Sequence, residues 1–208
     1  MDHAHDILKF WFGPKPYTAA RLSERMIFWF GNAGSPEMLA SKDNEIRQRF
    51  GAAIQRAAAG ELDCWADSPR RRLALIILLD QFPRNVYRGK AEAYAGDARA
   101  AALALEGLHT AADATLAPVE RIFFYMPLQH AESMELQDES VVATRRLLTE
   151  VPKVMARNFA SMLRFAELHR NIIAEFGRFP HRNAVLGRTS TPEELKFLRD
   201  GGPRFGSR

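Results

Sequence analysis

A continuous apolar run, Leu73 to Leu79, constrains the fold of this chain more than any other stretch. It follows Ser68-Pro69, a capping residue and a proline at the first helical position, which together are typical of a helix start. A helix through this run is apolar on every side, so other elements have to surround it. The run is also far shorter than the ~20 residues that a membrane span needs. We therefore expect it to form the central buried helix of a globular protein.

The remaining chain shows helical rather than strand patterns. After Ser41, apolar residues recur on one helical face until Gly60, and a similar stripe follows at about residues 154–177. No stretch of alternating β-branched residues requires a strand. Further helices are expected at residues 6–12, at about 94–107, from Pro118, at 138–150 and from Thr191 to Gly201. Seven to nine helices with short links predict an all-α fold of packed antiparallel pairs, and the 208 residues fit one domain spanning 1–208.

Pro83 and Pro127 stand where two of these helices are expected to end. Proline lacks the N–H group that a helix needs, and the residue before it avoids helical geometry. Two aromatic clusters lie nearer the N-terminus, at Phe10–Phe12 and Met26–Phe30. We expect both clusters to anchor the N-terminal segment in the core.

The charge balance is only mildly basic and falls short of indicating a nucleic-acid partner. Lys and Arg number 29 against 25 Asp and Glu, a net charge of +4, and the cluster Arg70–Arg72 is expected to be a solvated helix start. Cys64 is the only cysteine, which excludes an intrachain disulfide, and we expect a buried structural thiol there. Asp2 and Asp6 stand in place of the basic region of a signal peptide. These features predict a soluble cytoplasmic protein.

Polar residues gather at three places where a helix ends or where a helix face is otherwise apolar. Asp80 lies on the apolar stripe of the central helix, so its carboxylate requires an Arg, a His or backbone N–H groups as partner. His169 lies on the apolar stripe of the 154–177 helix. The three groups are Asp80, Arg84 and Asn85; Gln129, His130 and Glu132; and His169, Arg178, His181, Arg182 and Asn183. Sites are commonly built from such polar groups when rigid apolar helices bring them together.

The arginines suit an anion site. Arg84, Arg178 and Arg182 carry planar guanidinium groups that match a carboxylate or a phosphate. The alternative is a structural network, in which Asp80 pairs with Arg84 or Arg182, His169 bonds a backbone carbonyl and the asparagines cap helix ends. No Gly-rich phosphate loop, serine nucleophile elbow or dinucleotide fingerprint is present in the sequence.

The histidines and carboxylates suit catalysis. His130 or His169 could act as a general base that Asp80 or Glu132 orients. The same groups together with His181 could bind a metal ion, but no His-x-x-x-His or Glu-x-x-His pair supports this, and we assign no metal ligand. The catalytic candidates are therefore His130, His169, Asp80 and Glu132.

Five short strings extend in order over nearly the full chain. They are Phe10-Trp-Phe-Gly13, Asp80-Gln-Phe-Pro-Arg-Asn85, Tyr125-Met-Pro-Leu-Gln-His-Ala-Glu132, Phe176-Gly-Arg-Phe-Pro-His-Arg-Asn183 and Leu186-Gly-Arg188. Together they resemble the motifs of the bacterial "domain of unknown function 924" family. The resemblance implies an all-α fold similar to that of tetratricopeptide-repeat proteins, although no 34-residue repeat consensus is visible. It implies no reaction, because we know of none assigned to the family.

We interpret the protein as a helical-repeat-like binding module for an anionic small molecule or a peptide. The ligand-binding candidates are Arg84, Asn85, Arg178, His181, Arg182 and Asn183. Two alternatives use the same residues: a hydrolase or metal-assisted enzyme, and a structural scaffold without a ligand. The sequence names no cofactor and indicates neither a nucleic acid nor a membrane as partner.

Overall fold

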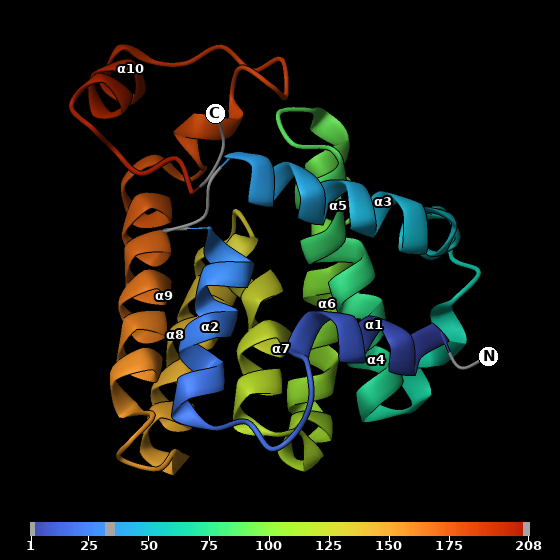
Figure 1. Ribbon diagram of the computed structural model, residues 1–208. Coiled ribbons are helices and arrows are strands. Elements are labelled where there is room, and N and C mark those ends of the chain that lie inside the picture. Colours follow the sequence, from blue (N-terminus) through green and yellow to red (C-terminus); the bar gives the residue numbers. More distant parts are fainter. Residues whose placement is uncertain (1–2, 32–35, 206–208) are drawn as a thin grey trace.

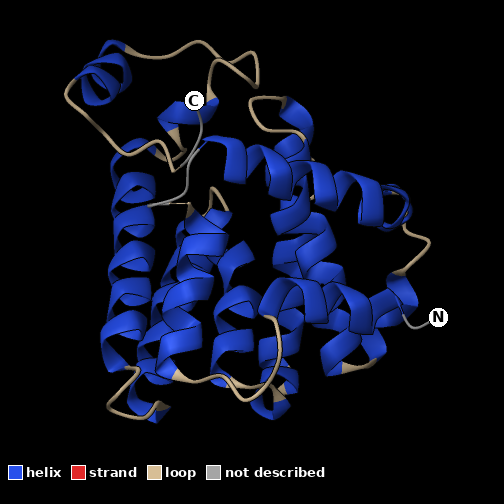
Figure 2. Ribbon diagram, viewed as in Figure 1, coloured by secondary structure: helices blue, strands red, loops and turns tan. Residues whose placement is uncertain are grey.

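The computed structural model describes residues 3–31 and 36–205, and every regular element in these ranges is a helix (Figures 1 and 2). Ten α-helical segments are present, of which α4 and α5 form one continuous helix through a π turn, so nine helices are described in all. They are α1 (His3–Phe12), α2 (Ala19–Phe30), α3 (Pro36–Ala58), α4 (Pro69–Ile76), α5 (Phe82–Val86), α6 (Asp97–His109), α7 (Pro118–His130), α8 (Met134–Glu150), α9 (Ala156–Phe176) and α10 (Pro192–Arg199). The predicted all-α fold of seven to nine helices is confirmed.

The apolar run lies in α4 and in the π turn Ile77–Gln81 that follows it. Leu73 to Leu79 are all buried, and none exposes more than 2% of its surface. Helices α1, α6 and α7 pack against α4, and α3 packs against the π turn (Figure 1). The prediction of a central buried helix is therefore confirmed.

Helices α6, α7, α8 and α9 follow one another in space as they do in sequence (Figure 1). Each packs on the next, and α8 has extensive contacts with both α7 and α9. The connections from α7 to α8 and from α8 to α9 are short, so these neighbours form antiparallel hairpins. The likeness to tetratricopeptide repeats and the single domain remain predictions.

Both helix ends expected at proline are wrong. The central helix continues past Pro83, because the residues before it form a π turn in which the Phe82 N–H donates to the Ile77 carbonyl. The chain then remains helical to the end of α5. Pro127 lies inside α7, which runs on to His130. Leu128 follows that proline directly and is fully buried, so packing compensates for the missing backbone hydrogen bond.

The aromatic clusters near the N-terminus are part of the main core. The Trp11 ring lies 5.6 Å from Phe82 and 5.5 Å from Phe123, measured between centroids, and Trp29 lies 4.6 Å from Phe123. Trp29 Nε1 donates a hydrogen bond of 2.8 Å to the Trp11 carbonyl. These contacts confirm that the two clusters anchor the N-terminal segment.

Cys64 is exposed, so the expectation of a buried thiol is wrong. It lies in a short 3-10 helix, Asp63–Asp67, which packs against α4. Trp65, the next residue, takes the buried position in this turn. A large aromatic side chain gains more from that position than a thiol would.

A smaller apolar cluster covers the C-terminal end of α9. Its buried members are Ile172, Ile173 and Phe179, and Phe197 of α10 packs against them. This cluster fixes the segment after α9, which lies beyond one end of the helical array (Figure 1). Helix α10 follows Thr191, where the sequence predicts a helix start, and Thr191 and Glu194 form a capping box there. None of the described helices is long and apolar enough to cross a membrane.

Candidate functional site

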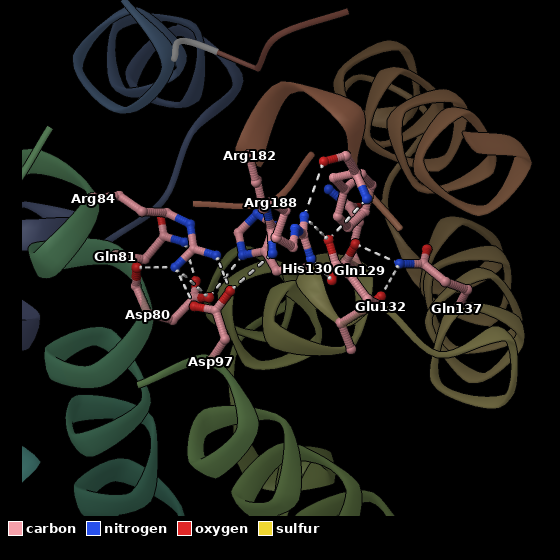
Figure 3. Close-up of polar contacts among 12 residues, drawn as sticks. Asp80, Gln81, Arg84, Asp97, Gln129, His130, Glu132, Gln137, Arg182 and Arg188 are labelled. Carbon is pink, nitrogen blue, oxygen red and sulfur yellow. Dashed lines mark hydrogen bonds and ion pairs between the residues drawn. The ribbon is translucent and has the colours of Figure 1, made fainter. Parts of the chain in front are cut away.

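Asp80 is fully enclosed, and its carboxylate is surrounded by polar groups (Figure 3). His130 Nδ1 lies 2.7 Å and Arg84 Nη1 lies 3.1 Å from Asp80 Oδ1, and Gln81 Nε2 donates to Oδ2. Burial alone would raise the pKa of this carboxyl, but Arg84 and His130 hold the pKa of Asp80 well below its usual range. These contacts favour an ionised Asp80, and the prediction that its carboxylate has an Arg, a His or backbone N–H groups as partner is confirmed.

The π turn places two further side chains of the first motif. Arg84 Nη1 donates to the Asp80 carbonyl at 2.7 Å, and Asn85 Nδ2 donates to the Gln81 carbonyl at 2.8 Å. These carbonyls lie one turn before their donors, where the wide turn and Pro83 interrupt the regular backbone pattern. Side chains thus bond backbone groups at the point where the helix changes its winding.

Asp97, the first residue of α6, joins two arginines from distant parts of the chain (Figure 3). Arg84 donates from Nη1 and Nη2 to the two carboxylate oxygens, each at 2.8 Å. Arg182 Nη1 donates to Asp97 Oδ2 at 3.2 Å. The Arg182 guanidinium also lies 4.7 Å from the ring centroid of Tyr94 and 4.4 Å from that of Phe179. The first and third motifs therefore meet at one carboxylate.

The pKa values of three imidazoles next to these groups are lowered, which favours their neutral forms. Burial, followed by the charge of Arg84, lowers the pKa of His130 despite the neighbouring Asp80 carboxylate. Burial lowers the pKa of His169 well below its ordinary value. Burial and the charge of Arg182 lower the pKa of His181 to about 3. With neutral imidazoles, the two guanidinium groups are balanced by the carboxylates of Asp80 and Asp97.

The hydrogen bonds of two histidines fix their tautomers. Because the Asp80 carboxylate is ionised, it accepts the Nδ1 proton of His130, and His130 Nε2 is left as an acceptor. His169 Nδ1 lies 2.7 Å from the Phe165 carbonyl and donates to it in the same way. His130 can therefore accept a proton at Nε2 from a bound molecule.

A cavity of about 90 Å³ lies among these groups. Its wall includes Arg84, Tyr94, His130, His169, His181 and Arg182. Arg182 exposes only 6% of its surface, yet its Nε has no hydrogen-bond partner among the described residues. His181 Nδ1 is also a buried atom without a hydrogen-bond partner among the described residues. Buried polar groups are normally paired, so these two atoms suit an acceptor or donor that is not part of the protein.

A larger cavity of about 620 Å³ adjoins the first. Five residues line both: Arg84, Arg88, His130, His169 and Phe205. The rest of its wall is mainly apolar and comes largely from α2, α3, α7, α8 and α9, including Met26, Trp29, Phe30, Ile122, Met126 and Met162. Asn85 and Gln129 are the remaining predicted polar residues that line it. Together the two cavities form one site, in which the smaller cavity is lined by charged groups and the larger cavity is mainly apolar.

The structure places three candidates of the third and second motifs away from both cavities. Arg178 donates to the two oxygens of Glu194 at 2.6 and 2.9 Å, and Asn183 Nδ2 donates to the same carboxylate at 3.0 Å. Glu132 accepts from Arg188 at 2.6 and 3.0 Å (Figure 3). Arg178, Asn183 and Glu132 line neither cavity. Their bonds hold together the segment after α9.

Sequence reasoning missed several residues of the site, including Asp97, Tyr94 and Phe205. Asp97 has the pattern of an ordinary acidic residue in the first turn of a helix, so nothing sets it apart. Tyr94 is a single aromatic residue beside a turn. Phe205 lies close to the C-terminus, and its ring stacks on His169 with centroids 3.7 Å apart. Only the fold brings these three to the predicted motifs.

Within the described ranges, no group of three or more His, Cys, Asp or Glu side chains is placed to hold a metal ion. The positive charges of Arg84 and Arg182 act on the imidazoles of His130 and His181 and oppose the binding of a cation there. The arrangement is suited instead to hydrogen bonding of an anion and to proton acceptance at His130.

Comparison with known proteins identifies the family and the fold. No curated protein matches the chain. A solved structure of a protein of unknown function from Agrobacterium tumefaciens is 37% identical in sequence and superposes with a TM-score of 0.70, covering 88% of this chain and 100% of that one. The family model described as "Bacterial protein of unknown function (DUF924)" matches residues 7–202. The chain therefore belongs to this family, as its motifs predict.

Proposed function

We propose that the protein binds an anionic small molecule whose charged group occupies the 90 Å³ cavity. The observation that carries the proposal is Arg182, a buried cation that lines this cavity and whose Nε lacks a partner. A buried donor on a charged group gains most from an anionic acceptor, because such hydrogen bonds are short and strong. His181 Nδ1 supplies a second unpartnered polar atom in the same wall.

The size of the cavity favours a small charged group over a peptide segment. The cavity measures about 90 Å³, well below the roughly 300–1,000 Å³ that is usual for small-molecule sites. This matches a carboxylate better than a stretch of polypeptide. Since one cysteine provides no disulfide framework, we place this activity in the cytoplasm.

A second candidate function rests on the pair formed by Asp80 and His130. A buried carboxylate that orients a neutral imidazole is an arrangement used for general base catalysis. His130 lines both cavities, so its Nε2 could take a proton from a water molecule that attacks a bound ester or amide. This candidate differs from simple binding in one readout: product would form from 4-nitrophenyl butyrate, and His130→Gln would abolish it.

The binding proposal is tested by calorimetric titration with sodium butyrate at pH 7. We expect saturable binding in the millimolar range, which corresponds to about 4 kcal/mol. Arg182→Gln should weaken it at least tenfold, since the neutral amide lacks the guanidinium charge. Arg170→Gln is the matched control, because Arg170 pairs with Asp138 on the surface and should leave binding unchanged. Equal affinities of wild type and Arg182→Gln would refute the proposal.

A further inference from the structure

The larger cavity adjoins the smaller one and indicates the chemistry of the rest of a ligand whose anionic group binds in the smaller cavity. The larger cavity begins where the smaller one ends, at the five residues that line both. A ligand whose charged group sits on Arg182 therefore has its remaining atoms directed either to solvent or along the apolar wall. The apolar route offers about 620 Å³, which lies within the usual range for small-molecule sites.

The wall of the larger cavity favours a flexible apolar chain. Met26, Met126 and Met162 line it, and methionine side chains adapt their shape to different apolar partners. Two charged side chains of its wall have hydrogen-bond or ion-pair partners within the protein. Lys42 donates to the Phe28 carbonyl at 2.7 Å, and Asp43 is held by Arg88 at 3.0 Å. The cavity thus offers apolar contact over most of its wall, and Arg182, whose Nε has no partner, lines the adjoining smaller cavity.

The charge balance at the junction limits the anion to a single charge. Asp80 and Asp97 already match the guanidinium groups of Arg84 and Arg182. A single added charge can be met by the unpartnered Arg182 Nε and by His181 in the tautomer that carries its proton on Nδ1, whereas a second charge would add further uncompensated negative charge in a buried place. A carboxylate satisfies this limit and also fits the volume of the small cavity.

From these observations we infer that the ligand is a medium-chain monocarboxylic acid, with its carboxylate on Arg182 and His181 and its hydrocarbon chain in the methionine-lined cavity. The inference rests on the proposed anion binding and adds the chemical class of the ligand. Phe205, which lines both cavities and stacks on His169, lies where the carboxylate end meets the chain.

The test compares sodium butyrate, sodium octanoate and 1-octanol in calorimetric titrations of the wild-type protein. Octanoate should bind about a hundredfold more tightly than butyrate, because it buries four more methylene groups. Octanol should bind at least tenfold more weakly than octanoate, since it carries no charge. Equal affinities for butyrate and octanoate would overturn this inference and leave anion binding intact. No binding of either acid, or equal binding of octanol and octanoate, would overturn both.

Two variants test whether the hydrocarbon chain of the ligand lies in the larger cavity. Met162→Trp fills the larger cavity and should bring the affinity for octanoate close to that for butyrate, while butyrate binding stays the same. Met38→Trp is the matched control, because Met38 lies on the exposed face of α3 and lines neither cavity. An octanoate affinity that survives Met162→Trp unchanged would exclude this cavity as the position of the chain.

Discussion

Replacing Asp80 by Asn should destabilise the protein by about 3 kcal/mol. The substitution keeps the shape of the side chain and removes a charge that is fully buried between Arg84 and His130. Loss of one partner from a buried ion pair costs about 3–5 kcal/mol. We expect the lower end, because Arg84 retains its two hydrogen bonds to Asp97. The free energy of unfolding would be measured by urea denaturation at pH 7, followed by circular dichroism.

A matched substitution and a second pH separate charge from packing. Asp138→Asn removes a charge paired with Arg170 at the surface, where such pairs contribute about 1 kcal/mol or less. The pKa of Asp80 is lowered by folding, so its contribution is present above the unfolded-state pKa of about 3.9 and is lost as pH falls below it. The difference between wild type and Asp80→Asn should therefore shrink from pH 5 to about pH 3.5. A loss at pH 7 as small as that of the Asp138→Asn control would refute the reasoning.

Two further predictions concern stability. Folding lowers the pKa of the three buried imidazoles, so the unfolded chain binds more protons below about pH 6.5, and stability should fall from there towards pH 5. Each imidazole contributes up to about 1.4 kcal/mol per pH unit, and His169→Gln should make thermal denaturation less dependent on pH; an unchanged dependence would contradict this. Gly96→Ala should cost at least about 2 kcal/mol, because the added Cβ would lie 2.4 Å from the Leu79 carbonyl oxygen. Gly51→Ala meets no atom within 4 Å inside α3 and should stabilise by up to about 1 kcal/mol, so the two melting temperatures should move in opposite directions.

The sequence predicted the helical fold well because the apolar pattern has one consistent period. The run from Leu73 to Leu79 can be satisfied only by burial on all sides, and it forms the centre of the structure. Local signals also predicted structure correctly where no distant contact opposes them, as at the helix start after Thr191. They failed at Pro83 and Pro127, because tertiary packing there outweighs the local preference of proline. Packing energies of this kind depend on neighbours that a local pattern does not contain.

The site was predicted in part for a similar reason. Asp80 could be found because a carboxylate on an apolar face needs a partner, and His130 could be found as a polar residue beside a proline. The sequence could not show that Arg84 and Arg182 share the carboxylate of Asp97. Asp97 lies 85 residues from Arg182 and has no unusual local pattern. Arg178 looked equivalent to Arg182 in the sequence, yet it pairs with Glu194 away from both cavities. Short-range patterns identify residues that need partners, and the fold determines the partners.

The π turn at Ile77–Gln81 changes the directions in which side chains point around the axis of the central helix. In a regular α-helix each residue is rotated by about 100° from the previous one, because there are 3.6 residues per turn. The wider turn rotates the side chains that follow it relative to those that precede it. Leu73, before the turn, faces the core, and Arg84, after the turn, faces Asp97. A family member one residue shorter here could keep the same core and still turn its arginine away from that carboxylate. We therefore expect the length of this segment to distinguish relatives that retain the charged cluster from relatives that share only the fold.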